Sequence, residues 1–197
     1  LNASDVAAAI QEDDPHFAVS KLVCVENTHD GMVMDQDEIE RIADIAHGNN
    51  MALHVDGARL MNAVVKSGHK ASELVACADT VSLCLSKGLG APVGSVLCGP
   101  KDFIHRARRA RKLLGGGLRQ AGVLAACGLF ALQNNIDRLE EDHANATAMA
   151  KRLADIPGLK FDMDKVQTNM IWLDITGKGQ GKLSDHMLAR GMIVTEP

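Results

Sequence analysis

Residues 81–91, Val-Ser-Leu-Cys-Leu-Ser-Lys-Gly-Leu-Gly-Ala, decide the fold class of this sequence. An alternating run over 80–85 is typical of a β-strand, and it ends in a lysine followed by a glycine-rich turn. Similar runs of strand length occur at 22–25, 52–55 and 94–98, and a segment of helical period at 35–49 separates the first two. This alternation predicts an α/β fold with a mainly parallel sheet covered by helices.

The second part of the chain has a different pattern. Residues 122–135 and 136–156 have helical spacing, and Pro157-Gly158 ends the second stretch. A strand is then expected at 170–173, a Gly/Lys-rich turn at 177–181 and a helix at 183–189, followed by the apolar pair Ile193-Val194. We therefore expect a large domain over 1–135, and a connector helix with part of a smaller α+β domain over 136–197.

The composition excludes several classes of protein. The 197 residues carry 21 Lys+Arg and 25 Asp+Glu, a net charge of −4, and only 3% are aromatic, so neither charge nor stacking favours nucleic acid. No apolar run reaches the roughly 20 residues of a membrane helix. Five widely spaced cysteines in apolar runs indicate buried free thiols, a reducing compartment and a cytoplasmic location. Because the chain starts with Leu1 and ends abruptly after an apolar run, we expect an interior fragment.

Lys87 is the first candidate for chemistry, since ligands of open α/β sheets bind beyond the carboxyl ends of the strands. A lysine in a tight turn at a strand end is expected to be partly desolvated, which lowers an ammonium pKa and favours the free amine that forms a Schiff base. A surface lysine in a loop is the alternative.

Asp56 and Arg59 follow another predicted strand, in the motif His-Val-Asp-Gly-Ala-Arg over 54–59. The carboxylate is a candidate partner for a pyridinium nitrogen, and the guanidinium is a candidate ligand for a carboxylate or a phenolic oxygen. The alternative for Asp56 is a helix cap. His54 and Asp56 also form a His-x-Asp pair, but without further ligands a packed strand histidine is favoured over a metal site.

A basic stretch at 106–112 leads into Gly115-Gly116-Gly117 and Arg119. The glycines precede a predicted helix, so their amides and the nearby Lys112 and Arg119 form a candidate anion or phosphate site, with a flexible linker as the alternative. The glycines of 88–94 fit neither the dinucleotide fingerprint nor the P-loop, because the lysine precedes them.

Together, four motifs resemble the low-specificity L-threonine aldolases, which are pyridoxal-phosphate enzymes of the aspartate aminotransferase fold. They are Glu-Asn-Thr-His at 26–29, His-Val-Asp-Gly-Ala-Arg at 54–59, Ser-Lys-Gly-Leu-Gly-Ala-Pro-Val-Gly at 86–94 and Gly-Gly-Gly-Leu-Arg-Gln at 115–120. The resemblance implies a large domain of the pyridoxal-phosphate-dependent transferase type and a Schiff base between the cofactor and Lys87. It also implies roles for further residues: Asp56 at the pyridine nitrogen, Arg59 and Lys112 at the substrate, Ser86 and Arg119 at the cofactor, and His16 near the substrate hydroxyl.

The activity implied by this resemblance is retro-aldol cleavage of L-threonine or L-allo-threonine to glycine and acetaldehyde. A small amino-acid substrate is expected, with no nucleic-acid or membrane partner and no metal, in a homodimer or homotetramer. Other members extend beyond both ends of this sequence and complete the site from those segments. A β-eliminating lyase of the same fold, an aminotransferase and a non-catalytic relative remain as alternatives.

Overall fold

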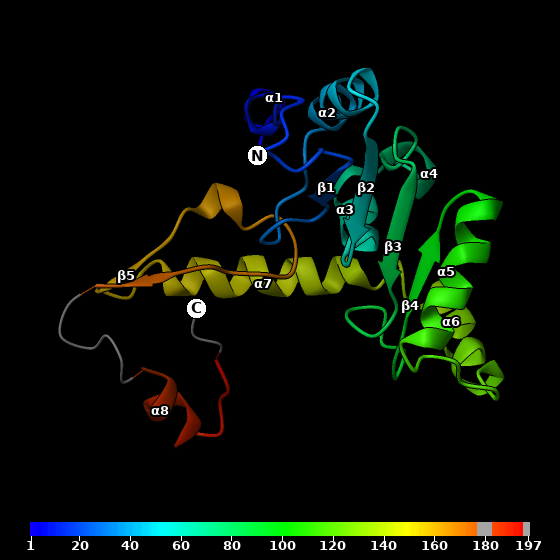
Figure 1. The fold of residues 1–197 in the computed structure, drawn as a ribbon. Helices are drawn as coiled ribbons and strands as arrows, with labels where there is room; N and C mark the ends of the chain where they lie inside the picture. The colour runs from blue at the N-terminus through cyan, green and yellow to red at the C-terminus, as the bar shows by residue number, and fades with distance from the viewer. Residues whose placement is uncertain (177–182, 195–197) are drawn as a thin grey trace.

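The computed structural model describes residues 1–176 and 183–194, and its main sheet has four strands in the order β1-β2-β3-β4 (Figure 1). The strands are β1 (Leu22–Glu26), β2 (Ala52–Gly57), β3 (Thr80–Cys84) and β4 (Ser95–Cys98). The first three are parallel, and β4 pairs antiparallel with β3. The predicted α/β fold with a mainly parallel sheet is confirmed.

The two faces of this sheet have opposite character. On β2, Leu53 and Val55 are fully buried, whereas Asp56 is exposed and His54 half-buried, because successive side chains of a strand point to opposite faces. The buried face packs against α2 (Gln36–Gly48), α3 (Leu60–Ser67) and α4 (Ala71–Leu74). The polar face therefore carries the motif residues at the carboxyl ends of the strands.

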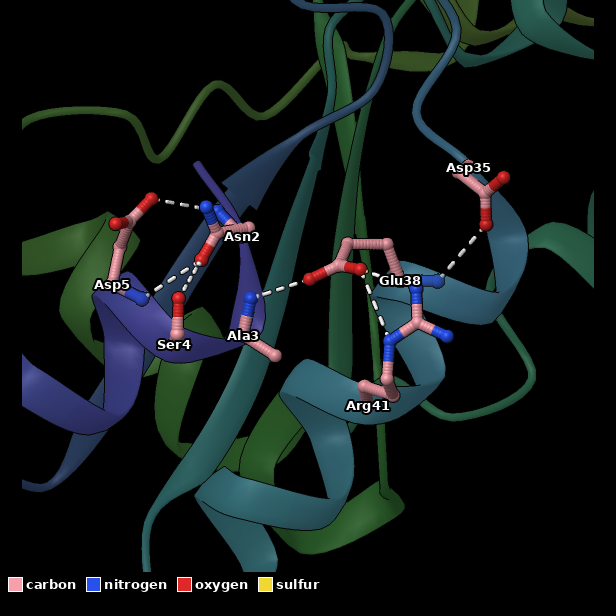
Figure 2. Close-up of polar contacts among 7 residues, drawn as sticks. All are labelled: Asn2, Ala3, Ser4, Asp5, Asp35, Glu38 and Arg41. Carbon is pink, nitrogen blue, oxygen red and sulfur yellow. Dashed lines mark hydrogen bonds and ion pairs between the residues drawn. The ribbon is translucent and has the colours of Figure 1, made fainter.

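Helix α2 matches the segment predicted at 35–49, and its start is fixed by local chemistry. Asp35 caps it by accepting a hydrogen bond from the amide of Glu38 at 3.1 Å. The Glu38 carboxylate accepts hydrogen bonds from the Arg41 guanidinium and from the amide of Ala3, which lies in α1 (Ala3–Ala9) (Figure 2). Glu38 thus joins α1 to α2, and the Arg41 bond is the main reason that the pKa of this carboxyl is lowered.

Helix α1 was not predicted, although its cap is readable in the sequence. The Asn2 side chain accepts from the amide of Asp5 at 2.9 Å, and the Asp5 carboxylate accepts from the amide of Asn2 at 3.0 Å (Figure 2). This reciprocal pair is a capping box. Helices α3 and α4 were also missed, because both are short.

A second, smaller core surrounds the turn that follows β3. Leu85 and Leu89 are buried there against Ala131 of α6 (Gly122–Asn134) and Leu139 of α7 (Leu139–Leu153). These helices confirm the helical predictions for 122–135 and 136–156, with α7 starting three residues later than predicted. The basic stretch is also helical, within α5 (Lys101–Leu113).

Helix α7 leads from the main sheet toward a two-stranded antiparallel sheet of β5 (Leu159–Lys160) and β6 (Asp174–Ile175) (Figure 1). A 3-10 helix, η1 (Met163–Lys165), lies between them, and α8 (Leu183–Leu188) matches the predicted helix at 183–189. The strand predicted at 170–173 is wrong. That segment follows Thr168, whose hydroxyl donates to the carbonyl of Gly31 at 2.6 Å and so holds the chain against the turn that follows β1. The turn predicted at 177–181 lies outside the described residues.

The cysteines are free, as predicted, but their burial was predicted wrongly. Cys24 lies on the polar face of β1 and is exposed, and Cys98 is exposed on β4, where all four residues are exposed. Cys77, Cys84 and Cys127 are half-buried. No helix within 1–176 or 183–194 has the length and apolar character needed to span a bilayer.

Candidate active site

Asp56 and Ser82 are brought together by the register of β2 and β3. The two residues are paired across the parallel strands, so their side chains leave the same face of the sheet. The Ser82 hydroxyl donates to Oδ1 of Asp56 at 3.2 Å, and the amide of Ala58 donates to the same oxygen at 2.9 Å. Asp56 therefore closes a short turn before α3 and is not the N-cap of that helix, whose N-cap is Arg59.

Backbone contacts fix the position of Asp56 from the other side. Its carbonyl accepts from the amide of Asn27 at 3.0 Å, where β1 ends, and Glu26 is its register partner. Glu26 pairs with Nδ1 of His29 at 3.0 Å, so the Glu-Asn-Thr-His motif forms the neighbouring rim of the site. Asn27 and Thr28 are fully buried beneath this rim.

Gly57 is needed because β2 and β3 lie very close at this point. A Cβ atom at residue 57 would lie 2.6 Å from the carbonyl oxygen of Ser82 and 3.0 Å from Cβ of Leu60. Only glycine leaves this space without moving the backbone. The glycine that follows Asp56 thus permits the approach that pairs Asp56 with Ser82.

Lys87 lies in a turn held by its own hydrogen bonds. Its carbonyl accepts from the amide of Gly90 at 2.9 Å, and the amide of Ala91 donates to the carbonyl of Leu85 at 2.9 Å. A Cβ atom at Gly88 would lie 2.7 Å from Leu139, so the turn packs tightly on α7. The position at a strand end is as predicted, but the predicted partial desolvation is wrong, because Lys87 is exposed.

Arg59, Cys84 and Lys87 line one small pocket between the start of α3 and the end of β3. Cys84 Sγ lies 3.6 Å from the hydroxyl of Ser86, the other predicted cofactor residue of this turn. Burial raises the pKa of the Cys84 thiol, but hydrogen bonds from Ser86 and Ser95 and the positive charge of Lys87 outweigh this effect, and the pKa is lowered overall. The pocket therefore combines two cationic side chains, Arg59 and Lys87, with a thiol whose pKa is lowered in part by Lys87.

His54 is a structural residue of the same face. Its Nδ1 lies 2.8 Å from the hydroxyl of Thr80, which is its register partner on β3. Its place within β2 and its contact with Thr80 agree with the packed strand histidine that the sequence favoured. His54 and Thr80 precede Asp56 and Ser82 by two residues on the same two strands, so both pairs lie on the same face of the sheet.

Of the predicted site residues, Arg59 and Lys87 line the pocket, and Asp56 and Ser86 lie within two residues of its lining in the chain. The other three, His16, Lys112 and Arg119, lie elsewhere. His16 is exposed, and its ring Nδ1 pairs with Asp14 at 2.7 Å. Lys112 ends α5, and Arg119 is exposed in the loop before α6. The structure leaves these side chains on other surfaces of the described chain.

The prediction of free glycine amides in this loop is wrong for two residues. The amide of Gly116 donates to the carbonyl of Arg111 at 2.8 Å, and the amide of Gly115 donates to that of Lys112 at 3.2 Å. Both amides cap the end of α5, because the last carbonyls of a helix lack partners within it. Helix α6 starts only at Gly122.

The motifs at the carboxyl ends of β1, β2 and β3 can now be compared with known proteins. Residues 1–176 match the family described as β-eliminating lyases. The chain belongs to the β-eliminating lyase family. Among relatives in this family, a low specificity L-threonine aldolase of Escherichia coli O157:H7 is 45% identical over 194 residues, which are 98% of this chain and 57% of that protein.

Further relatives of the β-eliminating lyase family agree with this result. Low-specificity L-threonine aldolase 1 of Arabidopsis thaliana is 42% identical over 178 residues, covering 89% of this chain and 50% of that protein. A solved threonine aldolase of Leishmania major has a TM-score of 0.69 at 22% identity, covering 81% of this chain and 48% of that one, which shows the fold. The resemblance to threonine aldolases is confirmed, and the chain spans about half the length of these relatives.

Pyridoxal phosphate is the cofactor implied by membership of this family, and the donor set of the site fits it. Lys87 has the primary amine that an aldehyde requires. Asp56 accepts both of its hydrogen bonds on Oδ1, and within residues 1–176 and 183–194 its Oδ2 makes none, so one oxygen remains for a pyridinium nitrogen. Arg59 adds a planar guanidinium beside the lysine.

Sequence analysis missed Ser82 and Cys84 as members of this site. Both belong to the alternating run over 80–85, and period-two spacing puts them on one face of β3. This spacing shows that Ser82 and Cys84 share a face of β3, but it does not show which residue of another strand either of them contacts. The pairing with Asp56 depends on the register between two strands, which the sequence of one strand does not contain.

Proposed function

We propose that this chain is part of a pyridoxal-phosphate-dependent aldolase that cleaves L-threonine and L-allo-threonine to glycine and acetaldehyde. The observation that carries the proposal is that Arg59 and Lys87 line one pocket at the carboxyl ends of β2 and β3. Asp56 lies three residues before Arg59, near the carboxyl end of β2 and on its polar face. The names of its relatives from E. coli and A. thaliana support the same activity.

Bound pyridoxal phosphate supplies an electron sink for the pair of electrons released when a bond to Cα breaks. Lys87 would hold the cofactor through its primary amine, which is the group that condenses with an aldehyde. Asp56 keeps a proton on the pyridine nitrogen, because a carboxylate stabilises the adjacent positive charge. Without that proton the sink is weaker.

Arg59 binds the carboxylate of the substrate through two parallel hydrogen bonds, which fixes the orientation of the substrate. Orientation selects which bond to Cα is broken, since binding alone favours none of them. His16 takes the proton of the β-hydroxyl, and Lys112 assists at the substrate. Ser86 and Arg119 bind the cofactor.

We also propose that the large cofactor-binding domain covers residues 1–135, and that 136–197 form the connector helix and part of a small domain. The two separate sheets and the long α7 between them support this division. A homodimer or homotetramer would bring further residues to His16, Lys112 and Arg119. The five free cysteines support a reducing, cytoplasmic location.

The test measures products of the intact protein supplied with pyridoxal phosphate. L-threonine and L-allo-threonine are expected to give equal amounts of glycine and acetaldehyde, and Lys87→Ala is expected to abolish both products. A β-eliminating lyase would instead release pyruvate from a substrate that carries a β-leaving group. Pyruvate without glycine contradicts the proposal, and so does full aldolase activity of a folded Lys87→Ala variant.

A further inference from the structure

We infer that Ser82 is a positioning residue that holds the carboxylate of Asp56 in one orientation for the cofactor nitrogen. The inference rests on the proposed function, because it requires Asp56 to face a pyridinium nitrogen. Its evidence is the hydrogen bond of 3.2 Å from the Ser82 hydroxyl to Oδ1 of Asp56.

The two hydrogen bonds to the Asp56 carboxylate both end on Oδ1 and leave Oδ2 available. The hydroxyl of Ser82 and the amide of Ala58 both donate to Oδ1, from different strands of chain. Two donors on one oxygen fix the rotation of the carboxylate about its terminal bond, which is otherwise broad. Oδ2 is thereby directed away from the backbone of residues 56–58 and is left to accept a proton donor.

The surrounding sheet makes Ser82 the side chain placed to do this. Register pairing puts Ser82 beside Asp56 on the polar face, and Gly57 permits the close approach of the two strands. On β1, the register partner of Asp56 is Glu26, whose carboxylate lies 3.0 Å from Nδ1 of His29. Ser82 is therefore the side chain among the described residues that donates a hydrogen bond to the Asp56 carboxylate.

Loss of the hydroxyl has two physical effects on cofactor binding. The carboxylate regains rotational freedom, which must be lost again when the cofactor binds. It also loses a hydrogen bond to its charged form, and this loss raises the pKa of a carboxyl and weakens its hold on a pyridinium proton. Both effects act through Asp56 and leave Lys87 unchanged.

The test is a double-mutant cycle that measures the Kd of pyridoxal phosphate for the intact apoprotein by absorbance titration. Ser82→Ala is expected to raise Kd about three- to tenfold, the effect of one ordinary hydrogen bond that acts through Asp56. Ser82→Thr keeps the hydroxyl and is expected to restore the wild-type Kd. In an Asp56→Ala background, Ser82→Ala is expected to have no further effect, because its partner is gone.

A control variant and a second measurement distinguish a positioning role of Ser82 from a general loss of structure. Ser67→Ala removes a hydroxyl that donates to the carbonyl of Ala63 at 2.7 Å on α3, and it is expected to leave Kd unchanged. The pH at which the visible band of the bound cofactor changes is expected to shift in Ser82→Ala and not in Ser67→Ala.

The outcomes distinguish this inference from the proposed function. Failure of the wild-type protein to bind pyridoxal phosphate overturns the proposed function. Normal binding and cleavage by the wild type, with an unchanged Kd in Ser82→Ala, overturns the inference alone. An equal rise in Kd in the presence and absence of the Asp56 carboxylate also overturns it, because the effect then does not pass through Asp56.

Discussion

At the scale of single residues, Arg59 has two possible contributions that kinetics can separate. Its backbone carbonyl starts α3, accepting from the amide of Asn62 at 2.9 Å, and its side chain lines the pocket with Lys87. Arg59→Lys keeps the backbone and the charge but loses the planar fork. We expect kcat/KM to fall by an amount that corresponds to a loss of about 2–5 kcal/mol in transition-state stabilisation. This is the range for truncating one partner of a buried charge pair.

Arg138→Lys is the matched control, because Arg138 also occupies an N-cap, that of α7, and is exposed outside the pocket. Steady-state kinetics and the thermal midpoint are measured on the same preparations. Wild-type kcat/KM in Arg59→Lys removes Arg59 from the substrate site, and an equal effect in both variants assigns it a structural role.

Cys84 and Cys77 make a second comparison of single residues. Burial raises the pKa of the Cys77 thiol, whereas the pKa of Cys84 is lowered by Ser86, Ser95 and Lys87 against the opposing effect of burial. The thiolate is the reactive form. We expect iodoacetamide at pH 7.5 to label Cys84 faster than Cys77, as followed by peptide mass spectrometry, and bound pyridoxal phosphate to slow only the labelling of Cys84. The reverse order of labelling contradicts this assignment.

The residue types of the site could be predicted from the sequence, but their environments could not. Arg59 and Lys87 meet at one pocket because each follows a strand, and Asp56 lies near the end of the strand that Arg59 follows; strand ends are visible in the pattern of apolar residues. The exposure of Lys87 and the bond from Ser82 depend on neighbours supplied by other strands and helices. His16 shows the same limit, since the partner that the structure gives its ring, Asp14, lies two residues away.

At the scale of elements, the contact between β2 and β3 controls the site. Gly57→Ala would place a methyl group 2.6 Å from the carbonyl of Ser82, so the two strands must separate. We expect the free energy of unfolding to fall by about 1–3 kcal/mol, as in other overpacked sites, and cofactor affinity to fall with it. Urea unfolding and cofactor titration measure the two effects.

Gly48→Ala is the control for this variant, because a Cβ atom at the last residue of α2 meets nothing within 4 Å. There we expect unchanged or slightly raised stability, since alanine restricts the unfolded chain. Equal stability of Gly57→Ala and Gly48→Ala would show that β2 and β3 can separate without loss.

Elements with a clear apolar period were predicted well, and elements defined by partners were not. Helix α2 and strands β1 to β4 have such a period and were located to within about two residues, the usual uncertainty of element ends. The segment 170–173 is apolar and strand-like in sequence, yet among the described residues it belongs to no strand, and the pairing with β5 involves Asp174 and Ile175 instead. Pairing partners come from the tertiary fold.

At the scale of the whole molecule, His143 links α7 to α3 and makes stability depend on pH. Its Nε2 lies 3.0 Å from Nδ2 of Asn62, and burial is the main reason that its pKa is lowered from the ordinary value of 6.5. The unfolded chain therefore binds more protons below pH 6.5 than the folded chain. Stability is complete above this pH and is lost as the pH falls through and below it.

We expect the thermal midpoint to fall between pH 7.5 and pH 5.5, and His143→Gln to reduce this fall, because glutamine offers Asn62 an acceptor and does not titrate. His105→Gln is the control, since His105 is exposed on α5. Differential scanning calorimetry over this pH range measures both variants. The same slope in His143→Gln and the wild type assigns the acid sensitivity to other groups.

The Asp56–Ser82 pair also has a consequence for the order of folding. Its two residues are 26 positions apart in the chain, within a single crossover from β2 through α3 and α4 to β3, whereas Asn62 and His143 are 81 apart. Closing the longer loop costs about 1 kcal/mol more in chain entropy. Contacts of short sequence separation form faster, so the carboxylate reaches its working orientation before α7 docks onto α3.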